Sequence, residues 1–206
     1  MKVLGLTGSI GMGKSTAAAL LRRRGVPVHE ADAAVHRLMG RGGAAVRAIE
    51  AAFPSAVRDG AVDRRALGAR VFGDQAAIAR LECILHPLVR QDSTRFLKQA
   101  RARRARIAVL DVPLLFEVGR ERDCDATMVV SAPRFVQRAR VLARAGMTQE
   151  RLALVLARQI PDAEKRRRAD FVVPTGLGRR VTLRRLIGVL KRLECGGVER
   201  KRRRRI

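Results

Sequence analysis

The chain has 206 residues, 47% of them hydrophobic, which suits one α/β domain with a full core and excludes a chain that is disordered throughout. No apolar run approaches the length of a membrane span and no export signal is visible, so we expect neither a membrane protein nor an exported one. The formal net charge of +25 would suit a nucleic-acid-binding protein. However, only 3% of the residues are aromatic and none is Tyr or Trp, so the chain has few side chains that could stack on bases. We therefore expect the arginines to serve phosphate recognition rather than specific nucleic-acid binding.

The predicted elements alternate between strands and helices along most of the chain. Apolar runs predict buried strands at residues 2–7, 26–28, 107–112, 125–130 and 171–173. Helical patterns cover residues 14–24, 33–53 with a break at 40–43, 63–106, 133–145, 148–159 and 179–193. The alternation predicts an α/β fold with a parallel sheet covered on both faces, in which the strand-free stretch 33–106 is a helical insertion. Residues 196–206 form a basic tail that we expect to be disordered.

A phosphate-binding loop is predicted between the first strand and the first helix. Residues 8–15, GSIGMGKS, match the pattern G-x-x-x-x-G-K-[ST]. Its glycines allow the backbone to turn its N–H groups inward, and the start of the following helix adds a positive dipole end. Lys14 would place a charge on the β- and γ-phosphates of ATP, and the Ser15 hydroxyl would be a ligand of Mg²⁺. The predicted nucleotide-binding residues of this loop are Gly8, Ser9, Ile10, Gly11, Met12, Gly13, Lys14, Ser15 and Thr16.

Other phosphate-loop chemistries are disfavoured by the rest of the sequence. A GTPase would carry an N/T-K-x-D guanine reader and a D-x-x-G switch, and neither stands in a sensible place. A motor-type ATPase usually has a second acid after the strand-terminal aspartate, whereas Asp111 is followed by Val112. A small kinase remains, in which the protein aligns an acceptor hydroxyl with the γ-phosphoryl group and excludes water.

Several motifs in a fixed order resemble the bacterial dephospho-CoA kinases, which phosphorylate the ribose 3′-hydroxyl of dephospho-CoA with ATP. They are HPLVR at 86–90, DVPLLFE at 111–117 and QRARVLAR at 137–144, and the resemblance extends from the first strand to about Gly178. It implies a three-layer P-loop kinase fold in a single domain, 1–195. The core would comprise 1–32, 107–135 and 160–195, the acceptor-binding insertion 33–106 and a small helical lid 136–159.

The resemblance also implies roles for individual residues. Asp32 would be the base or orienting group for the acceptor hydroxyl, because it follows the second strand and would face the phosphate loop, although its local sequence alone favours an N-cap of a helix at Ala33. Gln137, Arg140 and Arg144 would belong to the lid, with the two arginines on one helix face toward the phosphates and Arg140 counted as catalytic with Lys14 and Asp32. The implied acceptor-binding residues are His86, Arg90, Asp111, Leu115, Phe116 and Glu117.

Alternatives and departures accompany these assignments. Arg90 can instead lie on a solvated helix face, and Leu114, Leu115 and Phe116 can be core residues. Glu30 stands where the family usually has aspartate, which affects the outer shell of the metal. Thr175 stands near the position of a family asparagine in the adenine-side loop, so it offers a hydroxyl in place of an amide.

The resemblance thus implies an ATP:dephospho-CoA 3′-phosphotransferase that uses Mg²⁺. Another small-molecule P-loop kinase, such as a nucleoside monophosphate kinase, is the alternative with the same chemistry, and a nucleic-acid-binding ATPase is the alternative from another class. The three cysteines are far apart, which suggests neither a disulfide framework nor a zinc site and fits a reducing cytoplasm.

Overall fold

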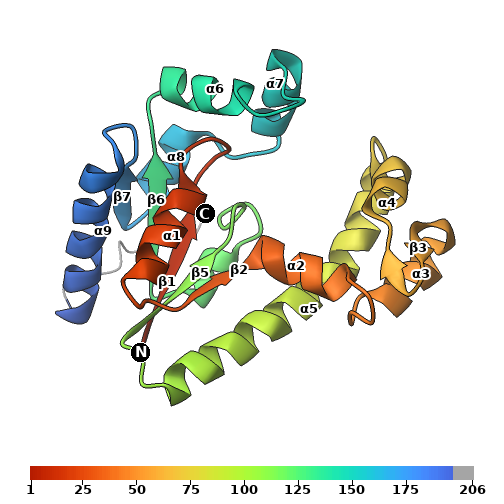
Figure 1. Ribbon diagram of the computed structural model, residues 1–206, viewed down its shortest axis with the longest axis horizontal. Coiled ribbons are helices and arrows are strands. Elements are labelled where there is room, and N and C mark those ends of the chain that lie inside the picture. Colours follow the sequence, from red (N-terminus) through yellow and green to blue (C-terminus); the bar gives the residue numbers. More distant parts are fainter. Residues whose placement is uncertain (197–206) are drawn as a thin grey trace. The chain divides into compact units, whose positions relative to one another are not determined.

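The computed structural model describes residues 1–196 and divides the chain into two compact units (Figure 1). One unit comprises Met1–His29 and the chain from Ala100 onward, and the other comprises Glu30–Gln99. None of the helices in the described part of the chain is both long and apolar enough to cross a membrane. The tail predicted for 196–206 lies, apart from Gly196, outside the described residues.

A five-stranded sheet forms the centre of the first unit. Its strands are β1 (Lys2–Thr7), β2 (Val28–Glu30), β5 (Ile107–Asp111), β6 (Ala126–Ser131) and β7 (Phe171–Pro174), in the order β2-β5-β1-β6-β7. β1 runs parallel to β5 and β6, and β6 runs parallel to β7, which confirms the predicted parallel sheet. The second strand begins two residues later than predicted. Pro27 has no N–H to donate, and its carbonyl accepts the Val109 N–H at 2.9 Å just before β2 begins.

Helices α1 (Lys14–Arg23) and α9 (Arg179–Glu194) lie side by side and cover one face of this sheet (Figure 1). The strands contribute Leu4, Leu6 and Met128 to the core on this face, and the helices contribute apolar side chains that include Leu21 and Leu186. Gly25 ends α1 in a left-handed conformation with φ 76°, as its position in the sequence predicts. The α/β fold class predicted from the sequence is therefore confirmed.

The remaining helices of this unit follow β5 and β6. They are η2 (Arg120–Asp123), α6 (Arg134–Leu142), α7 (Gln149–Ala157) and α8 (Asp162–Arg168). α6 and α7 lie beyond the carboxyl end of β6 in Figure 1, the end of the sheet at which the loop 8–13 lies. α8 was not predicted, because its sequence DAEKRRR carries no apolar stripe.

The second unit is helical apart from one short hairpin, and it has its own core. Its elements are α2 (Ala31–Met39), α3 (Val46–Ala52), η1 (Pro54–Ala56), β3 (Val57–Arg58), β4 (Ala61–Val62), α4 (Arg64–Val71) and α5 (Gln75–Ala102), the last of which continues past the boundary at Gln99. Ile49, Phe53 and Leu67 are buried together in this core. The predicted turn at Asp59-Gly60 joins the two strands, which are too short to show an alternating pattern.

Asp63 begins α4 as its N-cap. Its carboxylate accepts the N–H groups of Arg65 at 2.9 Å and Ala66 at 3.1 Å. The hydrogen bonds from Ala66 and Arg65 lower the pKa of this carboxyl below its ordinary value, because they stabilise the charged form.

Candidate phosphate-transfer site

The phosphate loop lies between the end of β1 and the start of α1, at the carboxyl edge of the sheet. Gly11 and Gly13 have φ angles of 76° and 86°, which only glycine adopts without strain. A Cβ on Gly8 would lie 2.8 Å from the carbonyl oxygen of Val130, so this glycine lets the loop pass close to β6. The sequence pattern therefore has the local geometry that it predicts.

Three consecutive carbonyls of this loop are bonded to side chains from elsewhere in the unit. Gln137 Nε2 donates to the Ile10 carbonyl at 2.8 Å, Arg140 Nη1 to the Gly11 carbonyl at 3.5 Å, and Thr175 Oγ1 to the Met12 carbonyl at 2.7 Å. Carbonyl oxygens that faced a phosphate would repel it. Because these three are engaged by protein donors, the loop is suited to present its N–H groups to an anion.

Lys14, the first residue of α1, contacts the acid at the end of β5. Its Nζ lies 2.8 Å from Asp111 Oδ1, and the side chain of Asp111 is 2% exposed while that of Lys14 is 18% exposed. The ion pair holds the lysine at the carboxyl edge of the sheet, beside the phosphate loop. In this structure Asp111 therefore contacts Lys14, whereas the sequence assigned it to the acceptor.

The residues at this edge fit a magnesium ion that is bound together with ATP. Ser15 is exposed and follows Lys14, and Asp111 supplies a carboxylate. Mg²⁺ prefers oxygen ligands and usually takes only one or two from the protein, with phosphates and water completing its shell. Among residues 1–196 no group of three or more His, Cys, Asp or Glu side chains could by itself hold a metal ion.

The prediction that Arg140 and Arg144 lie on one helix is wrong. α6 ends at Leu142, so Arg144 lies in the turn after it and is exposed. Arg140 donates from Nη2 to the Thr175 carbonyl at 2.7 Å as well as to Gly11, so it links the phosphate loop to the end of β7. Thr175 is 5% exposed and its hydroxyl is engaged by Met12, which makes it a support of the phosphate loop.

The segment after β5 differs from the acceptor wall that the sequence suggested. Leu115 is fully buried, and Phe116 packs against Val129 and Ala169 beneath the guanidinium of Arg168. Burial of this extent favours the core interpretation of Leu115 and Phe116, so we do not retain them as acceptor-binding residues. The buried side chains of Leu115 and Phe116 anchor this segment to the first unit.

Glu117 ends this segment in an ion pair with a buried lysine. Its Oε1 lies 2.7 Å from Nζ of Lys165, whose side chain has no exposed surface, and it also accepts the Ile160 N–H at 2.9 Å. Lys165 was not singled out from the sequence, because it stands in the basic run KRRR and looks like its solvated neighbours. A buried lysine requires a carboxylate nearby, and that partner is 48 positions earlier in the chain.

The other predicted residues lie in the Glu30–Gln99 unit. Glu30, not Asp32, is the N-cap of α2, and Asp32 is an exposed residue of the first turn, so the capping interpretation of Asp32 is wrong. His86 and Arg90 are exposed residues of α5. The Arg90 carbonyl accepts the hydroxyls of Ser93 and Thr94.

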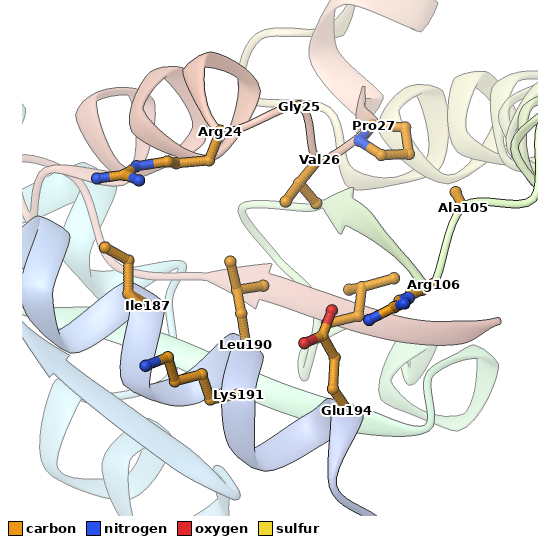
Figure 2. A pocket seen from close by; sticks show the side chains of 11 residues that line it. Arg24, Gly25, Val26, Pro27, Ala105, Arg106, Ile187, Leu190, Lys191 and Glu194 are labelled. Atoms are coloured by element: carbon orange, nitrogen blue, oxygen red, sulfur yellow. The ribbon is translucent and has the colours of Figure 1, made fainter.

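A pocket of about 340 Å³ lies at the opposite edge of the sheet and is not part of this site (Figure 2). Arg106 and Ile107 line it at the start of β5, together with Arg24 after α1 and Glu194 at the end of α9. The phosphate loop lies at the carboxyl ends of the strands, whereas this pocket lies at their amino ends. Charged side chains surround apolar ones there, as Figure 2 shows for Lys191 and Leu190.

Comparisons with protein families and with curated proteins both match this chain to dephospho-CoA kinases. A family model described as dephospho-CoA kinase matches residues 2–176. The dephospho-CoA kinase of Paramagnetospirillum magneticum is 67% identical over 166 residues, 81% of this chain and 78% of that protein. The dephospho-CoA kinase of Rhodospirillum rubrum is 57% identical over 203 residues, 98% of this chain and 95% of that protein.

Solved structures agree in fold. The crystal structure of TT1252 from Thermus thermophilus has a TM-score of 0.76 at 38% identity and covers 92% of this chain and 96% of its own. Dephospho-CoA kinase from Campylobacter jejuni has a TM-score of 0.64 at 21% identity, with coverages of 93% and 97%.

Proposed function

Because the chain belongs to the dephospho-CoA kinase family, it transfers a phosphoryl group from ATP to the ribose 3′-hydroxyl of dephospho-CoA, and we propose how its own residues serve that transfer. The observation that carries the proposal is the phosphate loop at the carboxyl edge of the sheet, with Lys14 at the start of α1 and Asp111 beside it. In open α/β sheets, ligands bind outside the carboxyl ends of the strands.

ATP is bound by the backbone of residues 8–16. The loop N–H groups and the start of α1 attract the phosphates, and Lys14, held beside the loop by Asp111, neutralises the β- and γ-phosphates. Mg²⁺, when bound, neutralises developing charge between those phosphates, and Ser15 and Asp111 are the residues that would hold it. Arg140 supports the loop through Gly11 and stands close enough to contribute positive charge to the site.

Dephospho-CoA is bound with its 3′-hydroxyl toward the γ-phosphoryl group. Asp32 accepts or orients the proton of that hydroxyl, and its exposed position in the first turn of α2 leaves the carboxylate accessible to a substrate. His86 and Arg90 are surface residues of α5, where an acceptor can reach them. Asp111 and Glu117 contribute through Lys14 and Lys165 rather than by touching the acceptor.

The alternatives left open by the sequence gain no support. The matched relatives carry the name of a dephospho-CoA kinase, not of a nucleoside monophosphate kinase or a nucleic-acid-dependent ATPase. Nonspecific adhesion to nucleic acid through the basic surface stays a prediction, as does a cytoplasmic location.

The test is purified protein with ATP, Mg²⁺ and dephospho-CoA, followed by mass analysis of the product. We expect a product one phosphate heavier, with the mass and chromatographic retention of CoA, and no such product with Lys14→Met. Parallel reactions offer nucleoside monophosphates as acceptors, or DNA and RNA as activators of ATP hydrolysis. Phosphorylated nucleotides without CoA, or nucleic-acid-stimulated hydrolysis alone, would contradict the assigned reaction.

A further inference from the structure

Ile10, in the phosphate loop, is bonded through both of its backbone polar groups to side chains from later in the chain. Gln159 Oε1, just after α7, accepts the Ile10 N–H at 3.1 Å. Gln137 Nε2, in α6, donates to the Ile10 carbonyl at 2.8 Å. The two peptide groups that flank the Ile10 Cα are therefore each oriented by a glutamine side chain.

The phosphate loop does not offer all of its N–H groups equally to an anion. Besides Ile10, Met12 uses its N–H within the protein and donates to the Ser9 carbonyl at 3.1 Å. An N–H that donates to a protein acceptor can bind a phosphate only if the existing bond breaks. The first turn of α1 differs in this respect, because the first N–H groups of a helix have no acceptor inside the helix. Phosphates are therefore attracted toward the start of α1.

The backbone from which the Gln159 side chain projects is fixed by contacts with the core. The N–H of the next residue, Ile160, donates to Glu117 Oε1 at 2.9 Å. The same carboxylate oxygen lies 2.7 Å from Nζ of the fully buried Lys165. The Ile160 side chain also packs against the core cluster that contains Phe116. Gln159 therefore reaches the phosphate loop from a base that is itself held in place.

We propose that Gln159 is a positioning residue that withholds the Ile10 N–H from the phosphates of ATP and so determines which N–H groups of the loop bind them. With Ile10 engaged, the phosphates lie against the start of α1 beside Lys14. A released Ile10 N–H would compete for the same oxygens and draw the γ-phosphoryl group out of line with the acceptor hydroxyl. A displacement of about 1 Å can lower turnover by about 10²-fold. This inference rests on the proposed assignment of the phosphate loop to ATP.

The test compares turnover with nucleotide affinity in Gln159→Met, which keeps the length of the side chain but removes the acceptor of the Ile10 N–H. Formation of CoA at saturating dephospho-CoA gives kcat and the KM for ATP, and calorimetry with a non-hydrolysable ATP analogue and Mg²⁺ gives the affinity. We expect kcat to fall by at least about tenfold, because part of the bound ATP is displaced. The analogue should bind at least as tightly as to wild type, because the released N–H is one more donor for phosphate.

Two further variants separate this role from general damage. Gln159→Glu keeps an oxygen that accepts the Ile10 N–H, so kcat should stay near the wild-type value. Its negative charge should instead raise the KM for ATP, and the increase should shrink at higher salt because the charge is screened. Gln149→Met makes the same substitution at an exposed residue at the start of α7 and should leave kcat and KM unchanged.

The outcomes that overturn the inference differ from those that overturn the assigned reaction. A merely structural role would loosen the loop, so that Gln159→Met binds the analogue more weakly and Gln159→Glu loses kcat to the same degree. Either of these results, or a wild-type kcat in Gln159→Met, would refute the role of Gln159 and leave the reaction standing. Absence of CoA formation by folded wild-type protein that binds the analogue would refute the assigned reaction, and the inference with it.

Discussion

Replacing Lys14 with methionine should destabilise the protein as well as inactivate it. Its partner Asp111 is 2% exposed, so the substitution removes the positive charge of an ion pair from beside a buried carboxylate. Breaking a buried ion pair on one side costs about 3–5 kcal/mol, and the 18% exposure of the lysine side chain places the expected loss near 3 kcal/mol. For a chain of this size that corresponds to a melting temperature lower by about 6–12 °C.

The double variant Lys14→Met/Asp111→Asn separates the two effects. Neutralising Asp111 as well should restore most of the lost stability, because a neutral pair carries no desolvation penalty of that size. Turnover should stay at least about 10²-fold below wild type in both variants, because the positive charge on the β- and γ-phosphates is absent.

Thermal unfolding and CoA formation measure the two quantities separately. Lys98→Met removes the same charge from an exposed position of α5 and should change neither. A single Lys14 variant that melts within about 1 °C of the wild type would refute the argument from burial, and so would a double variant that is no more stable than the single one.

Three further predictions concern other parts of the chain. Asp32→Asn should lower turnover by about 10²- to 10⁴-fold with ATP affinity unchanged. Because Asp32 lies in the first turn of α2, the lost interaction with the helix dipole should cost no more than about 1 kcal/mol of stability. Turnover above about a third of wild type in a stable variant would exclude the base role. Deleting residues 198–206 removes six basic side chains, so the protein should elute from heparin at a lower salt concentration. CoA formation should persist. Loss of CoA formation in a folded protein would show that the tail takes part in the site. The pKa of Asp63 is lowered in the folded protein, so its contribution to stability is present above the ordinary aspartate pKa and is lost as the pH falls through the lower folded value. Asp63→Ala should therefore be less stable than wild type at pH 7 and equally stable in strong acid. A difference in stability that does not depend on pH would contradict this reasoning.

The sequence predicted the elements whose signal is local. The apolar runs that became β1, β5 and β6 and the glycine pattern of the phosphate loop have recognisable neighbours along the chain. α8 carries no such signal, and its only fully buried side chain is that of a lysine.

The site was predictable in its chemistry and less so in its contacts. The pattern around Gln137 and Arg140 indicated a functional segment, but their bonds to Ile10 and Gly11 span about 130 positions of sequence and leave no periodic trace. Leu115 and Phe116 belong to a motif that suggested substrate contact, and tertiary packing uses them as core. Gln159 stands at the end of a helical pattern where a polar residue is ordinary, so only its bond to Ile10 distinguishes it.

The three tethered carbonyls of residues 10–12 also bear on how quickly and how tightly a nucleotide can be captured. Fixing the backbone of one residue costs about 1–2 kcal/mol in conformational entropy, and a glycine-rich loop would otherwise incur that cost for each residue when the ligand arrives. Because Gln137, Arg140 and Thr175 already hold this stretch, much of the ordering is complete before any encounter. Association should then be limited by diffusion and by the positive field of the protein, and loosening any one tether should appear chiefly as a faster dissociation of ATP.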